Sequence, residues 1–249
     1  MNEKLVSLFF LLFFLRLHLN EAKCSKIKWG KLVVIGDSNT QMGFGESQWL
    51  TKIADLFQRK CDVINRGFGG YNSTSINIML KQLFSEFKTD EICGFLILIG
   101  TNDSTNKENE LQYVSTNQFQ KNLQSILDFL SKIGIDKKRQ ILISPPRKAD
   151  LVSDYILKDY VQISKIIANE KSVIFVDLYN EMLLKGDEFY TYLSDGLHFS
   201  LAGGEFLFKK LKFYLKNNIE SNSNYLYPDW NDVKENMTLL NFCEPMSKN

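Results

Sequence analysis

Short runs of consecutive apolar residues alternate along this chain with longer segments in which apolar residues recur at helical spacing. The runs predict buried strands, because a strand covered on both faces reads as continuously hydrophobic, and they cover residues 32–35, 62–65, 94–99, 140–143 and 173–177. The amphipathic segments predict helices over residues 49–60, 76–87, 119–133, 155–168 and 202–216. Strands that alternate with helices in this way indicate an α/β domain with a five-stranded, mostly parallel sheet.

An apolar run over residues 5–15 precedes this pattern, with Lys4 before it and Arg16 after it. The run is shorter than the roughly 20 residues needed to cross a bilayer but has the length of a signal-peptide core. Ala22 offers a small residue for cleavage, so the sequence predicts a signal peptide over residues 1–22 and a protein that enters the secretory pathway or is secreted. A core helix and an uncleaved leader that tethers the protein to a membrane are the alternatives. If the leader is removed, no stable membrane span is expected.

The composition bounds the number of domains and excludes some classes of function. A chain of 249 residues that is 44% hydrophobic can bury one sizeable core, so residues 23–249 are predicted to form a single domain with a C-terminal tail over about residues 218–249. The 30 Lys and Arg residues balance the 29 Asp and Glu residues, which excludes the basic footprint of a protein that binds nucleic acid. The sequence gives no indication of the oligomeric state.

The cysteines do not form a metal-binding pattern. They are Cys24, Cys61, Cys93 and Cys243, with no C-x-x-C and no cluster with histidine, so a zinc site is not predicted. In an oxidising compartment four cysteines allow three pairings, and the sequence does not choose among them. Cys93 opens an apolar strand, so a buried thiol is the alternative interpretation there.

Residues 192–200 carry His198, the only histidine outside the leader. Proton transfer through an imidazole near neutral pH would therefore have to use His198. Asp195 stands three residues before it, close enough for its carboxylate to bind the ring within a single turn. A polar surface loop is the alternative interpretation of this pair.

Polar groups suited to acyl transfer follow the predicted strands. Ser38 lies in a Gly-Asp-Ser turn after the first strand, Gly70 in a glycine-rich loop after the second, and Asn102 in Gly-Thr-Asn-Asp after the third. Ligands of open α/β sheets bind at the carboxyl ends of the strands, so we expect these groups to converge with Asp195 and His198. His198 could then accept the Ser38 proton while Asp195 orients the ring. The N–H groups of Ser38 and Gly70 and the side-chain amide of Asn102 could stabilise an oxyanion.

Each of these groups also has a simpler interpretation. Gly-Asp-Ser is ordinary turn composition, Gly69 and Gly70 could serve only a tight loop, and Asn102 and Asp103 could cap the next element. Their appearance together, in order and at strand ends, favours a site, to which Asp37 and Asp103 add supporting carboxylates.

On these residues the chain resembles the SGNH hydrolases, also called the GDSL lipase/esterase family. The four family blocks stand here as Gly36-Asp37-Ser38, Gly70 within residues 67–71, Gly100-x-Asn102-Asp103 and Asp195-x-x-His198. The longer stretches R-G-F-G-G-Y, I-G-T-N-D, S-P-P and S-D-G-L-H-F-S are similar to the isoamyl acetate-hydrolysing esterase branch. This similarity runs from about residue 32 to the motif at residues 228–233.

The resemblance implies a three-layer α/β/α sandwich with a five-stranded parallel sheet in flavodoxin-like order, and it implies neither a metal nor an organic cofactor. It also implies a nucleophile at Ser38, a base at His198 and an orienting carboxylate at Asp195. The oxyanion hole would consist of Ser38, Gly70 and Asn102.

The sequence thus predicts a serine esterase for small or short-chain carboxylic esters, with a small-molecule ester or a lipid as its partner. The leader suggests a secretory-pathway lysophospholipase or glycan O-deacetylase as the alternative enzyme, and a catalytically inactive binding protein on the same fold is the alternative outside enzymes. Acyl preference is expected to depend on the loops at residues 41–47, 104–112 and 145–151. Sequons begin at Asn72, Asn102 and Asn236; we expect a glycan only at Asn236, because Asn102 would lie in an enclosed site.

Overall fold

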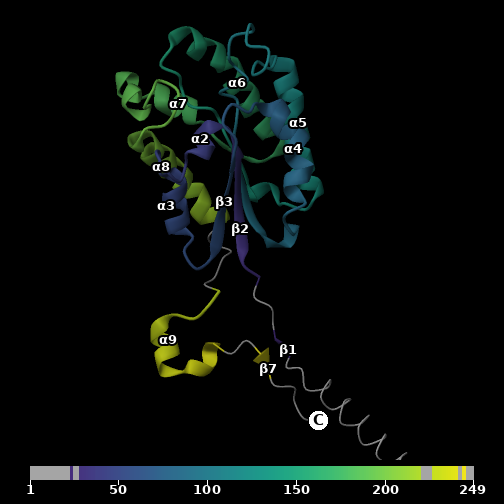
Figure 1. Cartoon of the computed structure of the whole chain (residues 1–249), viewed down its shortest axis with the longest axis vertical. Helices are drawn as coiled ribbons and strands as arrows, with labels where there is room; N and C mark the ends of the chain where they lie inside the picture. Colours follow the sequence, from purple (N-terminus) through teal and green to yellow (C-terminus); the bar gives the residue numbers. More distant parts are fainter. Residues whose placement is uncertain (1–22, 25–27, 220–225, 241–242, 245–249) are drawn as a thin grey trace, which may run out of the picture. The chain divides into compact units, whose positions relative to one another are not determined.

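The computed structural model in Figure 1 describes residues 23–24, 28–219, 226–240 and 243–244. The predicted signal peptide lies outside the described residues. The described residues divide into two compact units, one within residues 29–224 and a smaller one formed by described residues before and after that range. In the smaller unit, strand β1 (Lys23–Cys24) pairs antiparallel with β7 (Cys243–Glu244), and helix α9 (Trp230–Glu235) precedes the 3₁₀ helix η5 (Met237–Leu240).

The larger unit contains a five-stranded sheet in which every neighbouring pair of strands is parallel. Its spatial order is β3-β2-β4-β5-β6, which is the flavodoxin-like order. The strands are β2 (Gly30–Gly36), β3 (Cys61–Gly67), β4 (Ile92–Leu98), β5 (Gln140–Ile143) and β6 (Ile174–Val176). All five predicted strands are present, and the α/β/α sandwich is confirmed.

Two hydrophobic cores cover the two faces of the sheet, because successive side chains of a strand point to opposite faces. Val33 and Ile35 of β2 contribute to the core beneath helices α4 (Ser73–Phe84), α5 (Thr116–Lys132) and α6 (Leu151–Lys171). Leu32 and Val34 contribute to the core beneath α3 (Trp49–Leu56) and α8 (Leu201–Asn218). Figure 1 shows α4 and α5 on one side of the sheet and α3 and α8 on the other. Each large apolar side chain buried in this way stabilises the fold by about 1.5–3 kcal/mol.

Helix boundaries differ from the sequence-based ones because polar caps decide them. Asn72 accepts a hydrogen bond from the Ser75 N–H and starts α4 three residues earlier than predicted, at Ser73. Asp150 accepts from the Ser153 N–H and starts α6 at Leu151, four residues before the predicted start. A cap of this kind typically contributes about 1 kcal/mol. Between β6 and α8 lie α7 (Leu178–Leu183) and the 3₁₀ helix η3 (Gly186–Tyr192).

A disulfide joins Cys61 to Cys93, so the alternative of a buried thiol at Cys93 is wrong. The two cysteines lie at the amino ends of β3 and β4, which are separated by β2. The bridge passes Gly30 of β2, where an added Cβ would lie 3.6 Å from both the Cys61 Sγ and the Cys93 Cβ. The cysteines are 32 residues apart in sequence. A disulfide that closes a loop of that size typically stabilises the folded protein by about 2–4 kcal/mol.

No helix in the described part of the chain is both long and apolar enough to cross a membrane.

Candidate active site

Ser38 is the first residue of a four-residue helix, α2 (Ser38–Gln41), that starts directly after β2. The sequence predicted only a turn here. Asp37 caps the helix by accepting a hydrogen bond of 2.9 Å from the Asn39 N–H. The cap and the buried strand before it place the Ser38 side chain at the carboxyl edge of the sheet, where the strand order reverses between β2 and β4.

The segment that carries Asp195 and His198 is a tight loop. An isolated bridge between Leu193 and Phe199 closes it, and Gly196 turns the backbone at φ +88°. One oxygen of Asp195, Oδ1, accepts the N–H groups of Leu197 at 2.9 Å and His198 at 2.8 Å. The carboxylate therefore fixes the backbone of the loop as well as the ring of His198.

The side chains of Ser38, His198 and Asp195 form one hydrogen-bonded row. The His198 Nε2 lies 2.9 Å from the Ser38 Oγ, and its Nδ1 lies 2.6 Å from the Asp195 Oδ2. Partial burial alone would raise the pKa of Asp195, but hydrogen bonds from the His198 ring and from the two loop N–H groups lower it to about 2. An ionised carboxylate only accepts, so Nδ1 carries the ring proton and Nε2 is left to accept the Ser38 hydroxyl.

Asn39 holds the nucleophile helix and the histidine loop together. Its side-chain oxygen accepts the Phe199 N–H at 2.9 Å, and its side-chain nitrogen donates to the Leu197 carbonyl at 3.4 Å. Its own carbonyl accepts the indole N–H of Trp49 at 3.0 Å. Sequence reasoning missed this residue. The only signal was a polar side chain beside Ser38 at a strand end.

Three potential oxyanion donors come from the segments that follow β2, β3 and β4. Within the described residues, neither the Ser38 N–H nor the Gly70 N–H has a protein acceptor. Gly70 occupies the third position of a turn closed by a Tyr71 N–H to Phe68 C=O bond, and its φ of +79° is one that other residues rarely adopt. Asn102 is 8% exposed and donates to the Tyr71 carbonyl at 2.8 Å. One of its two amide hydrogens is thus held, and the other remains for a ligand.

The two predicted supporting carboxylates are buried behind these donors. Both oxygens of Asp103 accept the Ser73 N–H, at 2.9 and 3.1 Å, which ties the turn after β4 to the start of α4. Burial raises the pKa of Asp103 to about 7 and that of Asp37 to about 6. The Asn39 N–H and the Thr101 side chain oppose the rise in the pKa of Asp37.

A cavity of about 350 Å³ opens beside Asn102 and Asp195, and neither Ser38 nor His198 is among its lining residues. Its lining comes from the turn after β4, the loop at residues 104–112, the segment at residues 148–153 and the loop at residues 195–197. Two of the three loops expected to set acyl preference, at residues 104–112 and 145–151, contribute to it, whereas the loop at residues 41–47 does not. Most of the lining side chains are polar, which favours a small or hydrophilic ligand over a long alkyl chain.

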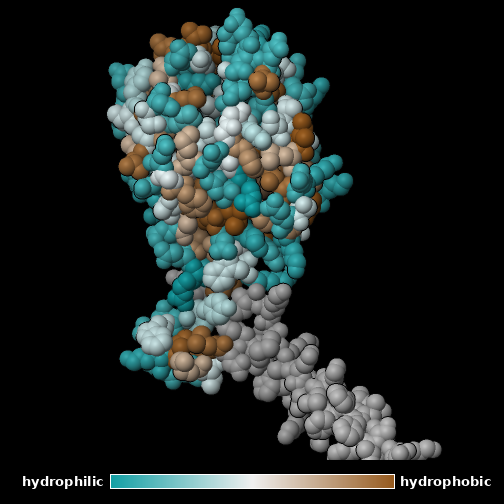
Figure 2. Space-filling view, viewed as in Figure 1, coloured by the Kyte–Doolittle hydropathy of each residue, from teal (hydrophilic) through white to brown (hydrophobic). Residues whose placement is uncertain are grey.

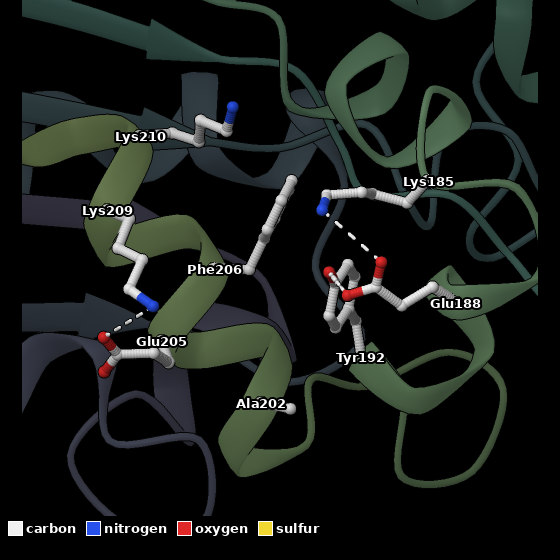
Figure 3. Close-up of a pocket in the computed structure, with 8 residues that line it drawn as sticks. All are labelled: Lys185, Glu188, Tyr192, Ala202, Glu205, Phe206, Lys209 and Lys210. Atoms are coloured by element: carbon white, nitrogen blue, oxygen red, sulfur yellow. Dashed lines mark hydrogen bonds and ion pairs between the residues drawn. The ribbon is translucent and has the colours of Figure 1, made fainter.

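A cavity of about 500 Å³ lies elsewhere, between η3 and α8. Figure 3 shows an ion pair on each wall, Lys185 with Glu188 and Lys209 with Glu205, and the ring of Phe206 between the walls. None of Ser38, Asn102, Asp195 and His198 lines it. It is therefore separate from the candidate active site despite its size.

The structure thus brings the predicted Ser38, His198 and Asp195 into one hydrogen-bonded row. Asn102 lines the cavity of about 350 Å³ together with Asp195. The Asn102 amide nitrogen, to which a glycan would be attached, is the atom that donates to Tyr71, and its burial supports the expectation that it carries none. Among the residues that the structure describes, no group of three or more His, Cys, Asp and Glu side chains could hold a metal ion.

The chain is similar to known proteins over most of its length. The sequence model of the GDSL-like lipase/acylhydrolase family matches residues 34–206. An isoamyl acetate-hydrolyzing esterase 1 homolog of Rattus norvegicus is 35% identical over 230 residues, which cover 86% of this chain and 92% of that protein. The Homo sapiens homolog is 32% identical over 227 residues, which cover 85% of this chain and 91% of that protein.

Solved structures share the fold at lower identity. A lipase/acylhydrolase from Enterococcus faecalis superimposes with a TM-score of 0.61 at 24% identity, over 79% of this chain and 98% of the other. The acetylxylan esterase Axe2 from Geobacillus stearothermophilus gives a TM-score of 0.63 at 21% identity, over 77% of this chain and 96% of the other. At these identities the similarity supports the α/β/α fold.

Proposed function

We propose, from the premise that this chain belongs to the GDSL-like lipase/acylhydrolase family and is a carboxylic ester hydrolase, that it hydrolyses small or short-chain esters through an acyl-enzyme on Ser38. The observation that carries the proposal is the contact of 2.9 Å between the Ser38 Oγ and the His198 Nε2. A serine hydroxyl is a weak nucleophile until a base takes its proton, and this contact supplies the base.

In the first half of the reaction, the Ser38 Oγ attacks the ester carbonyl while its proton passes to the His198 Nε2. Asp195 balances the imidazolium charge through Nδ1. The oxyanion of the tetrahedral intermediate accepts hydrogen bonds from the N–H groups of Ser38 and Gly70 and from the Asn102 amide. As the intermediate collapses, the ester C–O bond breaks and the alcohol leaves with the proton from His198.

In the second half, water attacks the acyl-enzyme and gives its proton to the same His198 Nε2. The same three donors stabilise the second oxyanion, and the carboxylic acid leaves as Ser38 recovers its proton. Each donor of this kind typically contributes about 10²- to 10³-fold in rate. Every residue used in this cycle belongs to the chain itself.

The proposed substrate is a small ester, because polar residues predominate among those that line the cavity of about 350 Å³ and relatives similar over most of the chain are isoamyl acetate-hydrolyzing esterase homologs. The same polar lining also favours the second candidate, a glycan O-deacetylase, whose substrate would join a short acetyl group to a hydrophilic leaving group. A long-chain lipase or lysophospholipase fits this lining less well.

A series of p-nitrophenyl esters from acetate to palmitate tests the substrate class. We expect kcat/KM to be highest for acetate or butyrate and roughly tenfold or more lower for palmitate, because a long alkyl chain does not fit a cavity of about 350 Å³ lined largely by polar residues, and the misfit raises the free energy of the transition state. The highest value for palmitate would overturn the short-chain proposal. Failure on the whole series, together with release of acetate from acetylated glycans, would support the deacetylase instead.

We propose that the protein enters the secretory pathway, with a tether through an uncleaved leader as the alternative. Two observations support this: the apolar run at residues 5–15 and the disulfide between Cys61 and Cys93, since disulfides persist mainly in oxidising compartments. Protein collected from the medium of eukaryotic cells that express the full chain is expected to begin at Lys23. Without reduction, Cys61 and Cys93 should resist alkylation. Retention of the protein inside the cells with an intact leader and free thiols would contradict the proposal.

A further inference from the structure

Lys148 is a buried lysine beside the cavity of the candidate active site. It lies in the loop between β5 and α6, is 6% exposed and lines the cavity together with Asn102 and Asp195. A lysine is rarely buried to this degree unless its charge has partners. The proposed reaction gives it no chemical step, so its burial calls for another explanation.

The ammonium group of Lys148 binds the turn that carries Asn102. Its Nζ lies 3.1 Å from the Ser104 Oγ and 3.4 Å from the Ser104 carbonyl oxygen. Ser104 in turn closes this turn, because its hydroxyl donates to the Thr101 carbonyl at 3.1 Å and its N–H to the Gly100 carbonyl at 3.2 Å. Asn102 lies inside the stretch that these bonds enclose, so Lys148 helps to fix the position of a proposed oxyanion donor.

The backbone next to Lys148 binds the loop of Asp195. The Ala149 N–H donates to the Gly196 carbonyl at 2.9 Å. Asp154 of α6 holds this segment in place. It accepts the Lys148 N–H at 2.9 Å and forms a buried ion pair of 2.9 Å with Arg147. One short segment therefore contacts both the turn that carries the oxyanion donor and the loop that carries the base.

Charge gives the ammonium group a second role. The charged groups that face it are Asp37 after β2, Asp103 after β4, and two carboxylates at the start of α6, Asp150 and Asp154. Asp37 and Asp103 are both buried and lie close enough to raise each other's cost of ionisation. A cation among these carboxylates lowers that cost.

We propose that Lys148 is a positioning residue. Its ammonium group fixes the position of the Asn102 turn relative to the Asp195 loop, so that the oxyanion donor and the base are both correctly placed around Ser38. This inference rests on the proposed acyl-enzyme function and extends it to a residue outside the four family blocks. It concerns the rate of the chemical step, because Lys148 acts on groups that stabilise the transition state.

The proposal predicts a pH effect. Burial lowers the pKa of Lys148 to about 8, although Asp154 and Asp37 oppose the shift. As pH rises through this value the ammonium loses its proton and its charge, so kcat of the wild type should fall with a midpoint near pH 8. A serine esterase with a histidine base otherwise loses activity only on the acid side, as the base becomes protonated.

The test compares Lys148→Met, Lys148→Arg and the control Lys158→Met, an exposed lysine of α6, by steady-state kinetics on p-nitrophenyl acetate from pH 6 to 10. For Lys148→Met we expect kcat to fall roughly 10- to 100-fold with little change in KM, because a misplaced donor loses part of the roughly 10²- to 10³-fold that it supplies. The fall of kcat near pH 8 should be absent in Lys148→Met. Lys148→Arg should retain a higher kcat than Lys148→Met and should also lack a fall near pH 8. Lys158→Met should match the wild type in kcat and in its pH profile.

Wild-type kcat in a folded Lys148→Met variant, or a fall of kcat near pH 8 that persists in it, would overturn the inference. If Lys148→Met does not fold, Ser104→Ala replaces it, since it removes the hydroxyl that the ammonium group contacts, and an unchanged kcat there would be equally adverse. A wild type with no loss of kcat near pH 8 also counts against the proposal. Loss of the inference is distinguishable from loss of the proposed function, because only the latter predicts that Ser38→Ala remains active.

Discussion

Replacement of Ser38 by alanine is expected to lower kcat by about 10⁵- to 10⁶-fold, the loss usual when the nucleophile of a serine hydrolase is removed. The variant should fold, because the only side-chain hydrogen bond of Ser38 in the described structure is with His198. The cap of α2 also remains, since Asp37 and the Asn39 N–H provide it. The fall of kcat in Ser38→Ala would therefore reflect the missing nucleophile and not a disturbed fold.

A fluorophosphonate probe gives a second measurement of the same variant. The wild type should be labelled at Ser38, because the probe reacts with an activated serine hydroxyl, and Ser38→Ala should not be labelled. Ser85→Ala is the matched control, since Ser85 is an exposed serine at the end of α4 and its loss should change neither kcat nor labelling. Labelling of Ser38→Ala to the wild-type extent, or activity within tenfold of the wild type, would refute the acyl-enzyme proposal.

The sheet was the part of the fold most accessible from the sequence. Strands β2 and β4 are buried on both faces, so their apolar runs are continuous and need no knowledge of the partner strands. The face of the larger unit that Figure 2 shows is mostly hydrophilic, with scattered hydrophobic side chains. This agrees with the helical spacing, which predicted that each covering helix turns its apolar side toward the sheet.

Features that depend on a single contact could not be predicted from the hydrophobic pattern. The helix α2 has four residues, which is too short for any periodicity, and it depends on the cap at Asp37. The pairing of Cys61 with Cys93 depends on the order of strands, because β2 lies between the two cysteines. Neither feature is visible in a local pattern of hydrophobic residues.

The candidate site was predictable as a set of strand ends but not as a network. Parallel strands bring their carboxyl ends to one edge, so Ser38, Asn102 and His198 could be expected to converge. Asn39 and Lys148 were not expected, because their roles depend on contacts with residues far away in sequence. Asn39 reaches Phe199 across 160 residues, and Lys148 reaches Ser104 across 44.

Replacement of His198 by alanine is expected to lower kcat by about 10⁵- to 10⁶-fold, nearly as much as loss of Ser38, since nucleophile and base act as one unit. The variant leaves the Asp195 carboxylate without its imidazole partner. That side chain is 55% exposed and still accepts the N–H groups of Leu197 and His198, so it can remain ionised and solvated while the loop keeps its conformation. The KM should change little, because the imidazole acts on a proton and contributes little to ground-state binding.

Cys93→Ala is the comparison that separates chemistry from stability. The Cys61–Cys93 disulfide lies at the amino ends of the strands, opposite the edge that carries Ser38, so its loss should lower the melting temperature while kcat remains near the wild-type value. His198→Ala should show the reverse, with a melting temperature near that of the wild type and almost no turnover. Steady-state kinetics and thermal unfolding of both variants check this pattern. Substantial turnover by a folded His198→Ala variant would mean that another group is the base. Since His198 is the only histidine outside residues 1–22, that base could not be an imidazole from residues 23–249.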